Sequence, residues 1–182
     1  MSDKLVYAGI GSRVITKEQF EFCRNVSREL AFQGWVLRSD GASGADTAFE
    51  EGCDEAKGEK EIYLPWKAFN DNVSSLNNPS LEAYDVARKF HPNYNVLTPG
   101  AIKLMARNSH QILGLDMNHP CNIVVYCAEE QVKGNVKGGT SQGIRITRSL
   151  KIPMINVYYN YMDPLSFIIN SIKSMVYINE YL

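Results

Sequence analysis

The sequence lacks the features that define several large classes of protein. Its apolar runs fall well short of the roughly 20 residues of a membrane-spanning helix. The start, Met1 to Lys4, leads into only about five apolar residues, too few for a signal peptide. The four cysteines, at positions 23, 53, 121 and 127, form no CxxC pair and match no zinc spacing, so we expect reduced thiols that lie partly in the core. These absences favour a cytoplasmic protein with no membrane partner and no metal site.

The sequence also lacks an excess of charge of either sign. Its 19 Lys and Arg residues and 20 Asp and Glu residues give a net charge of -1, which argues against a strongly basic nucleic-acid coat protein. It contains no HExxH motif and no arrangement of a nucleophile with His and an acid. A length of 182 residues with 45% hydrophobic residues is typical of one globular domain, here residues 1–182.

Short apolar runs alternate with helical patterns along the chain. We expect strands over residues 5–8, 35–37, 61–64, 122–127 and 153–157. The first expected helix begins with a capping box at Thr16 and Gln19 and ends at Gly34. Others are expected over about 45–56, from 140 to 150, and after Asp163 as N-cap and Pro164 at the first helical position. The last helix has one apolar face, formed by Leu165, Ile168, Ile169, Ile172, Met175 and Val176.

This order predicts an α/β fold, a Rossmann-like parallel sheet of about five or more strands with helices on both faces. Between the third and fourth strands lie residues 66–121, too many for a plain connection. We expect a helical insertion there, with helices over about 79–90 and 98–113.

Three glycine-rich segments follow expected strands, at residues 9–13, 41–46 and 138–140. Ligands of such sheets bind at the carboxyl ends of the strands, where glycine allows close approach to backbone N–H groups. A following helix N-terminus favours phosphate. Each segment could instead be a plain turn, but three at one sheet edge favour a nucleotide-type site.

Several side chains near these segments are candidates for ligand contacts, each with a simpler structural alternative. Arg13 could hold a phosphate or lie on the surface. Asp46 and Glu50, four residues apart, could bind ribose or act as general acid and base, although their spacing alone favours a solvated face. Trp66 could stack on a base or cover the insertion.

In the insertion, a polar stripe runs along one face of an expected helix: Lys103, Arg107, His110 and Gln111. This stripe could contact phosphate or a polyanion. A solvated face is the commoner outcome for such a pattern, and we expect it here.

The loop motifs resemble the SLOG superfamily and, within it, DprA-like proteins, many of them encoded by phages. The resemblance rests on residues 7–13 (YAGIGSR), 38–50 (RSDGASGADTAFE), 61–66 (EIYLPW), 106–108 (ARN) and 138–140 with Ile144 and Arg145, and it covers about residues 5–157. The superfamily implies a modified Rossmann fold that binds nucleotides or nucleotide-derived ligands. Its members include LOG-type phosphoribohydrolases, single-stranded-DNA-binding recombination mediators and sensors of ADP-ribose-like immune signals.

Two positions depart from this pattern. The second loop of such proteins usually reads Ser-Gly-Gly-Ala, and here Asp40 replaces the first glycine. The LOG hydrolases resemble one another in a GGxGTxxE motif whose acid serves N-glycosidic chemistry, and here Arg145 stands at the position of that acid. Because Arg does not act as a base at neutral pH, LOG-type hydrolysis would need Asp46 or Glu50 instead, and Arg145 suggests a phosphate contact.

The leading hypothesis is therefore a binding protein, not an enzyme, for a nucleotide, an ADP-ribose-like or a cyclic nucleotide ligand. The resemblance to phage proteins and immune-signal sensors implies sequestration of a signalling molecule, in a homo-oligomer and without a further cofactor. The predicted ligand-binding residues are Gly9, Gly11, Ser12, Arg13, Ser39, Asp40, Gly41, Ala42, Gly44, Asp46, Glu50, Trp66, Arg107, Asn108, Gly138, Gly139, Thr140 and Arg145. The alternatives are a hydrolase of N-glycosidic or phosphate bonds and, disfavoured by the net charge, a DprA-like single-stranded-DNA binder.

Overall fold

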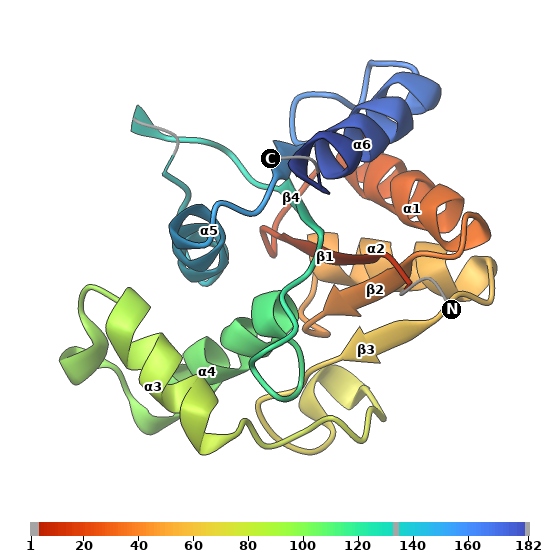
Figure 1. Ribbon diagram of the computed structural model, residues 1–182. Helices are drawn as coiled ribbons and strands as arrows, with labels where there is room; N and C mark the ends of the chain where they lie inside the picture. The colour runs from red at the N-terminus through yellow and green to blue at the C-terminus, as the bar shows by residue number, and fades with distance from the viewer. Residues whose placement is uncertain (1–3, 133–134, 181–182) are drawn as a thin grey trace.

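The computed structural model describes residues 4–132 and 135–180, and its centre is a parallel sheet of five strands in the order β3-β2-β1-β4-β5 (Figure 1). The strands are β1 (Val6–Gly11), β2 (Val36–Ser39), β3 (Lys60–Ile62), β4 (Ile123–Cys127) and β5 (Met154–Asn156). The helices are α1 (Lys17–Phe32), α2 (Ala45–Glu55), α3 (Leu81–Phe90), α4 (Pro99–Leu113), α5 (Thr140–Ser149) and α6 (Leu165–Glu180). This is the predicted α/β Rossmann-like architecture, and the two helices of the insertion are confirmed as α3 and α4.

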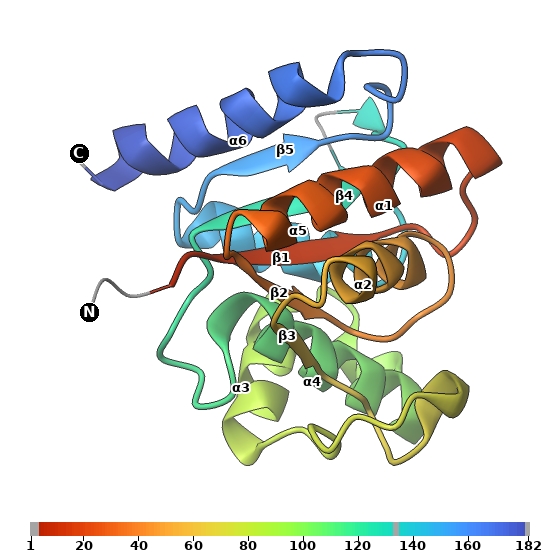
Figure 2. The ribbon, with the colours of Figure 1, turned by 90° about the vertical axis from the view of Figure 1, so that its right-hand side faces the viewer.

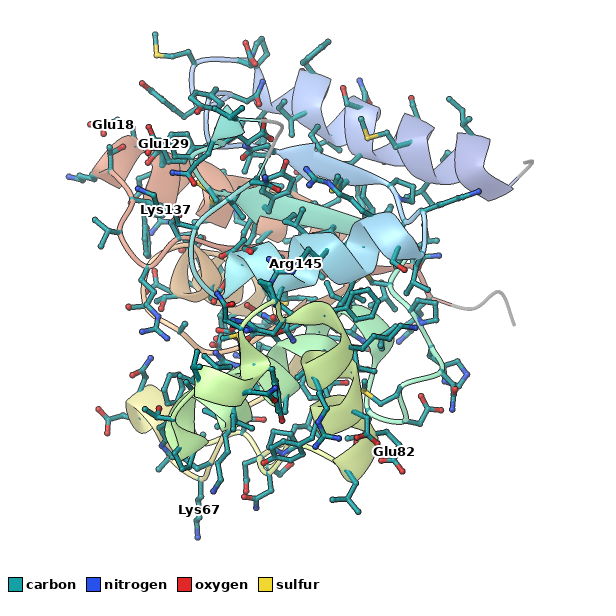
Figure 3. The ribbon with its side chains drawn as sticks, turned by 90° about the vertical axis from the view of Figure 1, so that its left-hand side faces the viewer. Glu18, Lys67, Glu82, Glu129, Lys137 and Arg145 are labelled. Atoms are coloured by element: carbon teal, nitrogen blue, oxygen red, sulfur yellow. The ribbon has the colours of Figure 1, made fainter. Side chains whose placement is uncertain are left out.

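Helices cover both faces of the sheet, as predicted. Helices α1, α2 and α6 lie on one face (Figure 2), while α4 and α5 lie on the other, with α3 outside them (Figure 3). Successive side chains of β1 point to opposite faces of the sheet, which explains the two layers. Tyr7 belongs to the core under α1, whereas Ala8 and Ile10 belong to the core under α4 and α5.

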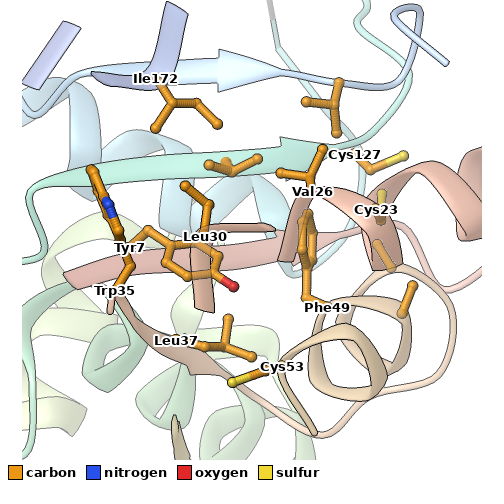
Figure 4. Packing of buried hydrophobic residues seen from close by; sticks show 14 of the residues in the cluster. Tyr7, Cys23, Val26, Leu30, Trp35, Leu37, Phe49, Cys53, Cys127 and Ile172 are labelled. Atoms are coloured by element: carbon orange, nitrogen blue, oxygen red, sulfur yellow. The ribbon is translucent and has the colours of Figure 1, made fainter. Parts of the chain in front are cut away.

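The larger core lies between the sheet and α1, α2 and α6 (Figure 4). Tyr7 and Trp35 meet there edge to face at 6.4 Å between ring centroids, and the Tyr7 hydroxyl shares a hydrogen bond of 2.7 Å with Ser27 Oγ. The predicted capping box of α1 is confirmed by two reciprocal hydrogen bonds between Thr16 and Gln19.

The four cysteines are all buried and unpaired, as expected for core thiols. Burial raises the pKa of Cys53 to about 11 and that of Cys121 to about 12, so both thiols stay neutral near pH 7. The neighbouring Cys127 thiol and burial likewise raise the pKa of Cys23.

The first strand is longer than predicted, because Gly9, Ile10 and Gly11 pair with Val125, Tyr126 and Cys127 of β4 instead of forming a loop. A Cβ at Gly9 would lie 2.8 Å from Phe49 Cγ, and one at Gly11 would lie 2.4 Å from the Cys127 oxygen. These two glycines are therefore required by close packing within the sheet layers.

The apolar face of α6 is mainly core packing. Ile168, Ile169, Ile172 and Val176 are buried against the larger core, whereas Met175 is 37% exposed. In the described part of the chain, no helix combines the length and the hydropathy needed to cross a membrane.

We predict that Ile172→Ala lowers the free energy of unfolding by about 2–4 kcal/mol, because Ile172 is fully buried and its truncation leaves a cavity. Ile178→Ala in the same helix removes a side chain that is 62% exposed and should change stability by less than about 0.5 kcal/mol. Urea unfolding of both variants tests the packing of α6, and equal losses would contradict it.

Candidate functional site

A cavity of about 570 Å³ opens at the carboxyl ends of β1, β2 and β4. Because β2 and β4 lie on opposite sides of β1, this is the point where the strand order reverses, and ligands of open α/β sheets bind at such points. The wall is formed by Ile10, Gly11, Ser12, Arg13, Val14, Asp40, Ala42, Asp46, Leu104, Met105, Arg107, Asn108, Gln111, Lys137, Gly138, Gly139, Thr140 and Gly143.

Most of the predicted site residues belong to this wall. The structure brings together residues of the three glycine-rich segments and of the insertion, namely Gly11, Ser12, Arg13, Asp40, Ala42, Asp46, Arg107, Asn108, Gly138, Gly139 and Thr140. The sheet edge and the insertion thus form the two sides of one cavity.

The loop after β1 is fastened by backbone hydrogen bonds on both sides. Ser12 N–H donates to the Cys127 oxygen at 2.8 Å, and the Ser12 oxygen accepts from Ala45 N–H, at the start of α2, at 3.1 Å. Gly44 has a φ of +83°, and a Cβ there would lie 2.4 Å from the Ser12 oxygen, so only glycine fits. At the N-terminus of α2, one backbone N–H group, that of Ala45, is therefore already bonded to this loop.

A buried ion pair joins the loop after β2 to the insertion. Arg107 Nη2 lies 3.0 Å from Asp40 Oδ2, and the Arg107 and Asp40 side chains are only 3% and 9% exposed. Arg107 Nη1 also donates to the Asp40 backbone oxygen, and Asp40 Oδ1 accepts from Ala42 N–H at 2.9 Å. The carboxylate that replaces the usual glycine is thus neutralised by Arg107.

Asp46 lies in the same wall and is 3% exposed. Burial raises the pKa of its carboxyl well above the usual range. The nearby Asp40 raises this pKa further, and the positive charge of Arg107 lowers it. The Asp46 carboxyl therefore holds its proton more tightly than an exposed aspartic acid does. The prediction of a solvated face for Asp46 is wrong.

The polar stripe on α4 is also buried for most of its length. Arg107, His110 and Gln111 are each no more than 3% exposed, so the predicted solvated face is wrong, and of the stripe only Lys103 is exposed. Arg107 lies over the Phe69 ring at 5.3 Å, and His110 stacks on Tyr63 at 5.2 Å. The insertion therefore packs its polar face against the edge of the sheet.

Four side chains of the wall contain buried polar atoms with no hydrogen-bond partner among the described residues. These atoms are Asp46 Oδ1, Arg107 Nε, Asn108 Oδ1 and Gln111 Nε2. Buried polar groups are ordinarily satisfied, so such a concentration in one wall marks a surface suited to a polar ligand.

Another part of the wall is positively charged and exposed. It contains Arg13, Lys137 and the start of α5, where Thr140 Oγ1 donates to the Gly11 oxygen at 2.8 Å. The backbone N–H groups of Ser141 and Gln142 donate to the Gly138 and Gly139 oxygens, so the two side-chain cations are the main attraction for an anion here. Figure 3 shows Lys137 beside the sheet, near the start of α5.

Three predicted ligand contacts lie outside the wall. Glu50 accepts from Lys60 Nζ at 2.8 Å and from Asn72 Nδ2 at 3.0 Å, so it joins α2 to β3 and to the segment that contains Asn72. Trp66 meets Phe69 edge to face at 5.2 Å and covers the insertion. Arg145 donates through Nε to the Phe90 oxygen at 2.6 Å and through Nη1 to Ser141 Oγ, and thereby ties α5 to the end of α3 (Figure 3).

Four further predicted positions support the wall without lining it: Gly9, Ser39, Gly41 and Gly44. Ser39 Oγ donates to the Gly9 oxygen at 2.8 Å, and the Gly41 oxygen accepts from Asn70 Nδ2 at 3.0 Å. Their role in the structure is to shape the loops.

Sequence reasoning did not assign Ile10, Val14, Leu104, Met105, Gln111, Lys137 or Gly143 to the site. Gln111 was part of the predicted polar stripe, four residues after Arg107 on the same helix face, but a solvated face was the preferred interpretation of that stripe. The apolar residues had no such signal. Among the described residues, no group of three or more His, Cys, Asp or Glu side chains is placed to hold a metal ion.

We predict that Asp46→Asn stabilises the protein, and more so at pH 8 than at pH 4. The raised pKa means that the folded state keeps a proton that the unfolded chain loses above about pH 4, so the stability of the unaltered protein falls as pH rises towards the folded pKa. The amide of the variant is neutral at every pH and so needs no proton in the folded state. The measurement is urea unfolding at several pH values, with Asp85→Asn on the exposed face of α3 as control; a pH-independent difference would contradict the raised pKa of Asp46.

No family model matches the sequence, and no curated protein matches it either. The fold, in contrast, is similar to solved structures. DNA processing protein A (DprA) from Helicobacter pylori, described by its single-stranded DNA binding mode, has 17% identity and a TM-score of 0.58 over 93% of this chain and 80% of that one.

Two molybdenum cofactor proteins are similar as well. The Moco carrier protein from Chlamydomonas reinhardtii has 15% identity and a TM-score of 0.58 over 96% of this chain and 98% of that one. The molybdenum cofactor binding protein from Rippkaea orientalis has 18% identity and a TM-score of 0.54 over 86% of this chain and 77% of that one. At the level of the fold, the predicted likeness to DprA is therefore confirmed: the chain has the Rossmann-like fold of DprA and of the molybdenum cofactor carriers.

Proposed function

We propose that this chain binds a nucleotide or nucleotide-derived small molecule, with its phosphate at the basic side of the cavity and its uncharged part against the buried polar side. The observation that carries this proposal is the cavity at the switch point of the sheet, whose wall combines a basic rim with incompletely bonded buried side chains. Its volume of about 570 Å³ is within the usual range for small-molecule sites.

The distribution of charge sets the orientation of the ligand. Asp40 and Asp46 lie against Arg107 on one side, and a phosphate placed there would meet two carboxyl groups with a single guanidinium. Arg13 and Lys137 belong to the exposed part of the same wall, where a phosphate would meet cations. The phosphate therefore binds at this exposed, basic part of the wall.

The ligand is held and not hydrolysed. Arg145, at the position where LOG hydrolases carry their acid, is engaged with Phe90 and Ser141 away from the cavity, and Glu50 is engaged with Lys60 and Asn72. A protein that keeps its ligand intact acts as a carrier or as a sequestering agent, and the sequence resemblance favours sequestration of a signalling molecule. A homo-oligomer remains part of this proposal.

Hydrolysis is the second candidate, and one observation favours it. Asp46 is a buried carboxyl in the cavity wall with a raised pKa, and such a group can donate a proton to a leaving group. Chromatography of a bound nucleotide after long incubation separates the two: intact ligand released on denaturation supports binding, and product formation that Asp46→Asn abolishes supports hydrolysis.

We predict that phosphate-bearing nucleotides raise the melting temperature of the protein, since a ligand that binds only the folded state stabilises it. Lys137→Ala and Arg13→Ala should each weaken binding several-fold, because each removes a cation from the rim. The matched control is Lys67→Ala, an exposed cation far from the cavity, which should leave binding unchanged (Figure 3).

A panel of nucleoside monophosphates, ADP-ribose, cyclic nucleotides and ribose 5-phosphate, measured by thermal shift and calorimetry, tests this proposal. The absence of a shift with every phosphate-bearing ligand would contradict it. Binding of single-stranded DNA that falls steeply with salt, without small-molecule binding, would instead support a DprA-like role.

A further inference from the structure

A second stripe of side chains runs along α6 on the side away from the core. A period of 3.6 residues per turn places four residues on this line, which we call the outer stripe: Phe167, Ser171, Ser174 and Ile178. Phe167, Ser174 and Ile178 are exposed, whereas Ile172 on the inner side is fully buried. Figure 2 shows α6 along the edge of the molecule, beyond α1 and β5, so the outer stripe faces away from the fold.

The surface around the outer stripe contains almost no charge. Of the 20 residues from Tyr159 to Ile178 only Asp163 and Lys173 are charged, although charged residues make up 21% of the whole chain. Neither of the two belongs to the outer stripe. The exposed face of a surface helix is ordinarily charged or polar, and interfaces are depleted of charge and enriched in aromatic residues and Met. This surface therefore has the composition of an interface.

The exposed apolar area of this segment suits a stable dimer. Tyr159, Phe167 and Tyr177 are each more than half exposed, and at about 200 Å² for a whole aromatic side chain they expose roughly 300 Å² together. Met162 and Ile178 are also more than half exposed and add to this area. A stable interface buries about 800 Å² per partner, of which somewhat more than half is apolar. These five side chains account for most of that apolar share.

The order of side chains in the outer stripe indicates which partner fits. Phe167 and Ile178 stand at its ends and two serines between them, at spacings of four, three and four residues, a pattern that reads the same in both directions. If two copies of α6 pack antiparallel about a two-fold axis at the middle of the stripe, Phe167 of one copy lies opposite Ile178 of the other. Ser171 then lies opposite Ser174. The stripe is thus complementary to itself.

The two serines suit the centre of such an interface. Their small side chains let two helices approach closely, and the spacing of three and four residues is that of helices that pack at about 20°. Ser171 Oγ donates to the Phe167 oxygen at 2.9 Å within the helix, so its burial leaves no unsatisfied hydroxyl donor.

We propose that two copies of this chain form a dimer through the outer stripe of α6, with the two helices antiparallel. The inference goes beyond the proposed function, because it concerns a surface that needs no ligand, and it gives the homo-oligomer of that proposal a place and a symmetry. In the described part of the chain, the cavity wall contains no residue of α6, so the dimer leaves both ligand sites intact.

Sedimentation equilibrium of the unaltered protein tests the inference, and the mass should rise from one chain to two with increasing concentration. Ser174→Glu places a carboxylate at the centre of the stripe, where the dimer would bury it, and should raise the dissociation constant at least about tenfold. The matched control is Ser149→Glu, at an exposed serine of α5 on the other face of the sheet, which should leave the dissociation constant unchanged.

A compensating variant tests the antiparallel pairing. Ser171→Lys combined with Ser174→Glu places an ammonium group opposite each introduced carboxylate of the other copy, so dimerisation should recover several-fold relative to Ser174→Glu alone. If these variants do not fold, hydrogen exchange of the unaltered protein decides, since the amides of α6 should exchange more slowly at concentrations that favour the dimer. The comparison of Ile178→Ala with Ile172→Ala refers to the monomer and is made well below the dissociation constant.

Three results would overturn the inference. A protein that stays monomeric into the millimolar range would remove the dimer and leave the ligand site untouched. A dimer that Ser174→Glu weakens no more than Ser149→Glu does would remove α6 as the interface. A compensating variant that dimerises no better than Ser174→Glu would remove the antiparallel pairing.

Discussion

The close pairing of β1 with β4 at Gly11 is the constraint on which the rest of the structure depends. A Cβ at Gly11 would lie 2.4 Å from the Cys127 oxygen and 2.6 Å from Ala45 Cβ, so the absence of a side chain lets β1, β4 and α2 meet. This contact joins the two halves of the sheet, since β2 and β3 lie to one side of β1 and β4 and β5 to the other. The loops diverge directly beyond it, and the cavity is the space they leave.

Charges that cancel in the whole chain are distributed unevenly within the cavity wall. A net charge of -1 suggests a surface without electrostatic preference, yet the wall combines the exposed cations Arg13 and Lys137 with the buried acids Asp40 and Asp46. Arg107 is buried beside Asp40, with which it pairs. A ligand that carries a phosphate and a neutral polar part can meet the exposed cations with the one and the buried residues with the other.

Features encoded within a few residues could be predicted from the sequence, and features made by distant contacts could not. The capping box of Thr16 and Gln19, the alternation of strands and helices and the glycine-rich segments are local, and they led to the fold and to most of the wall. The burial of Asp46 and of the α4 stripe depends on Arg107 reaching Asp40 across 67 positions, which no local pattern encodes. For Trp66 the sequence left both base stacking and cover of the insertion open, and the structure shows the second through its contact with Phe69. Arg145 was assigned to a phosphate because no local pattern shows that it bonds to the Phe90 oxygen, 55 positions away.

The ion pair between Asp40 and Arg107 limits the substitutions that are tolerated at these two positions. Asp40 comes from the loop after β2 and Arg107 from the insertion, and either charge without the other would be buried and uncompensated. Replacement of Asp40 by an uncharged residue would remove the need for a cation at position 107, whereas loss of Arg107 alone would leave the Asp40 carboxylate buried without a counter-ion. The insertion can therefore be replaced in this chain only by a segment that supplies a cation at the same place.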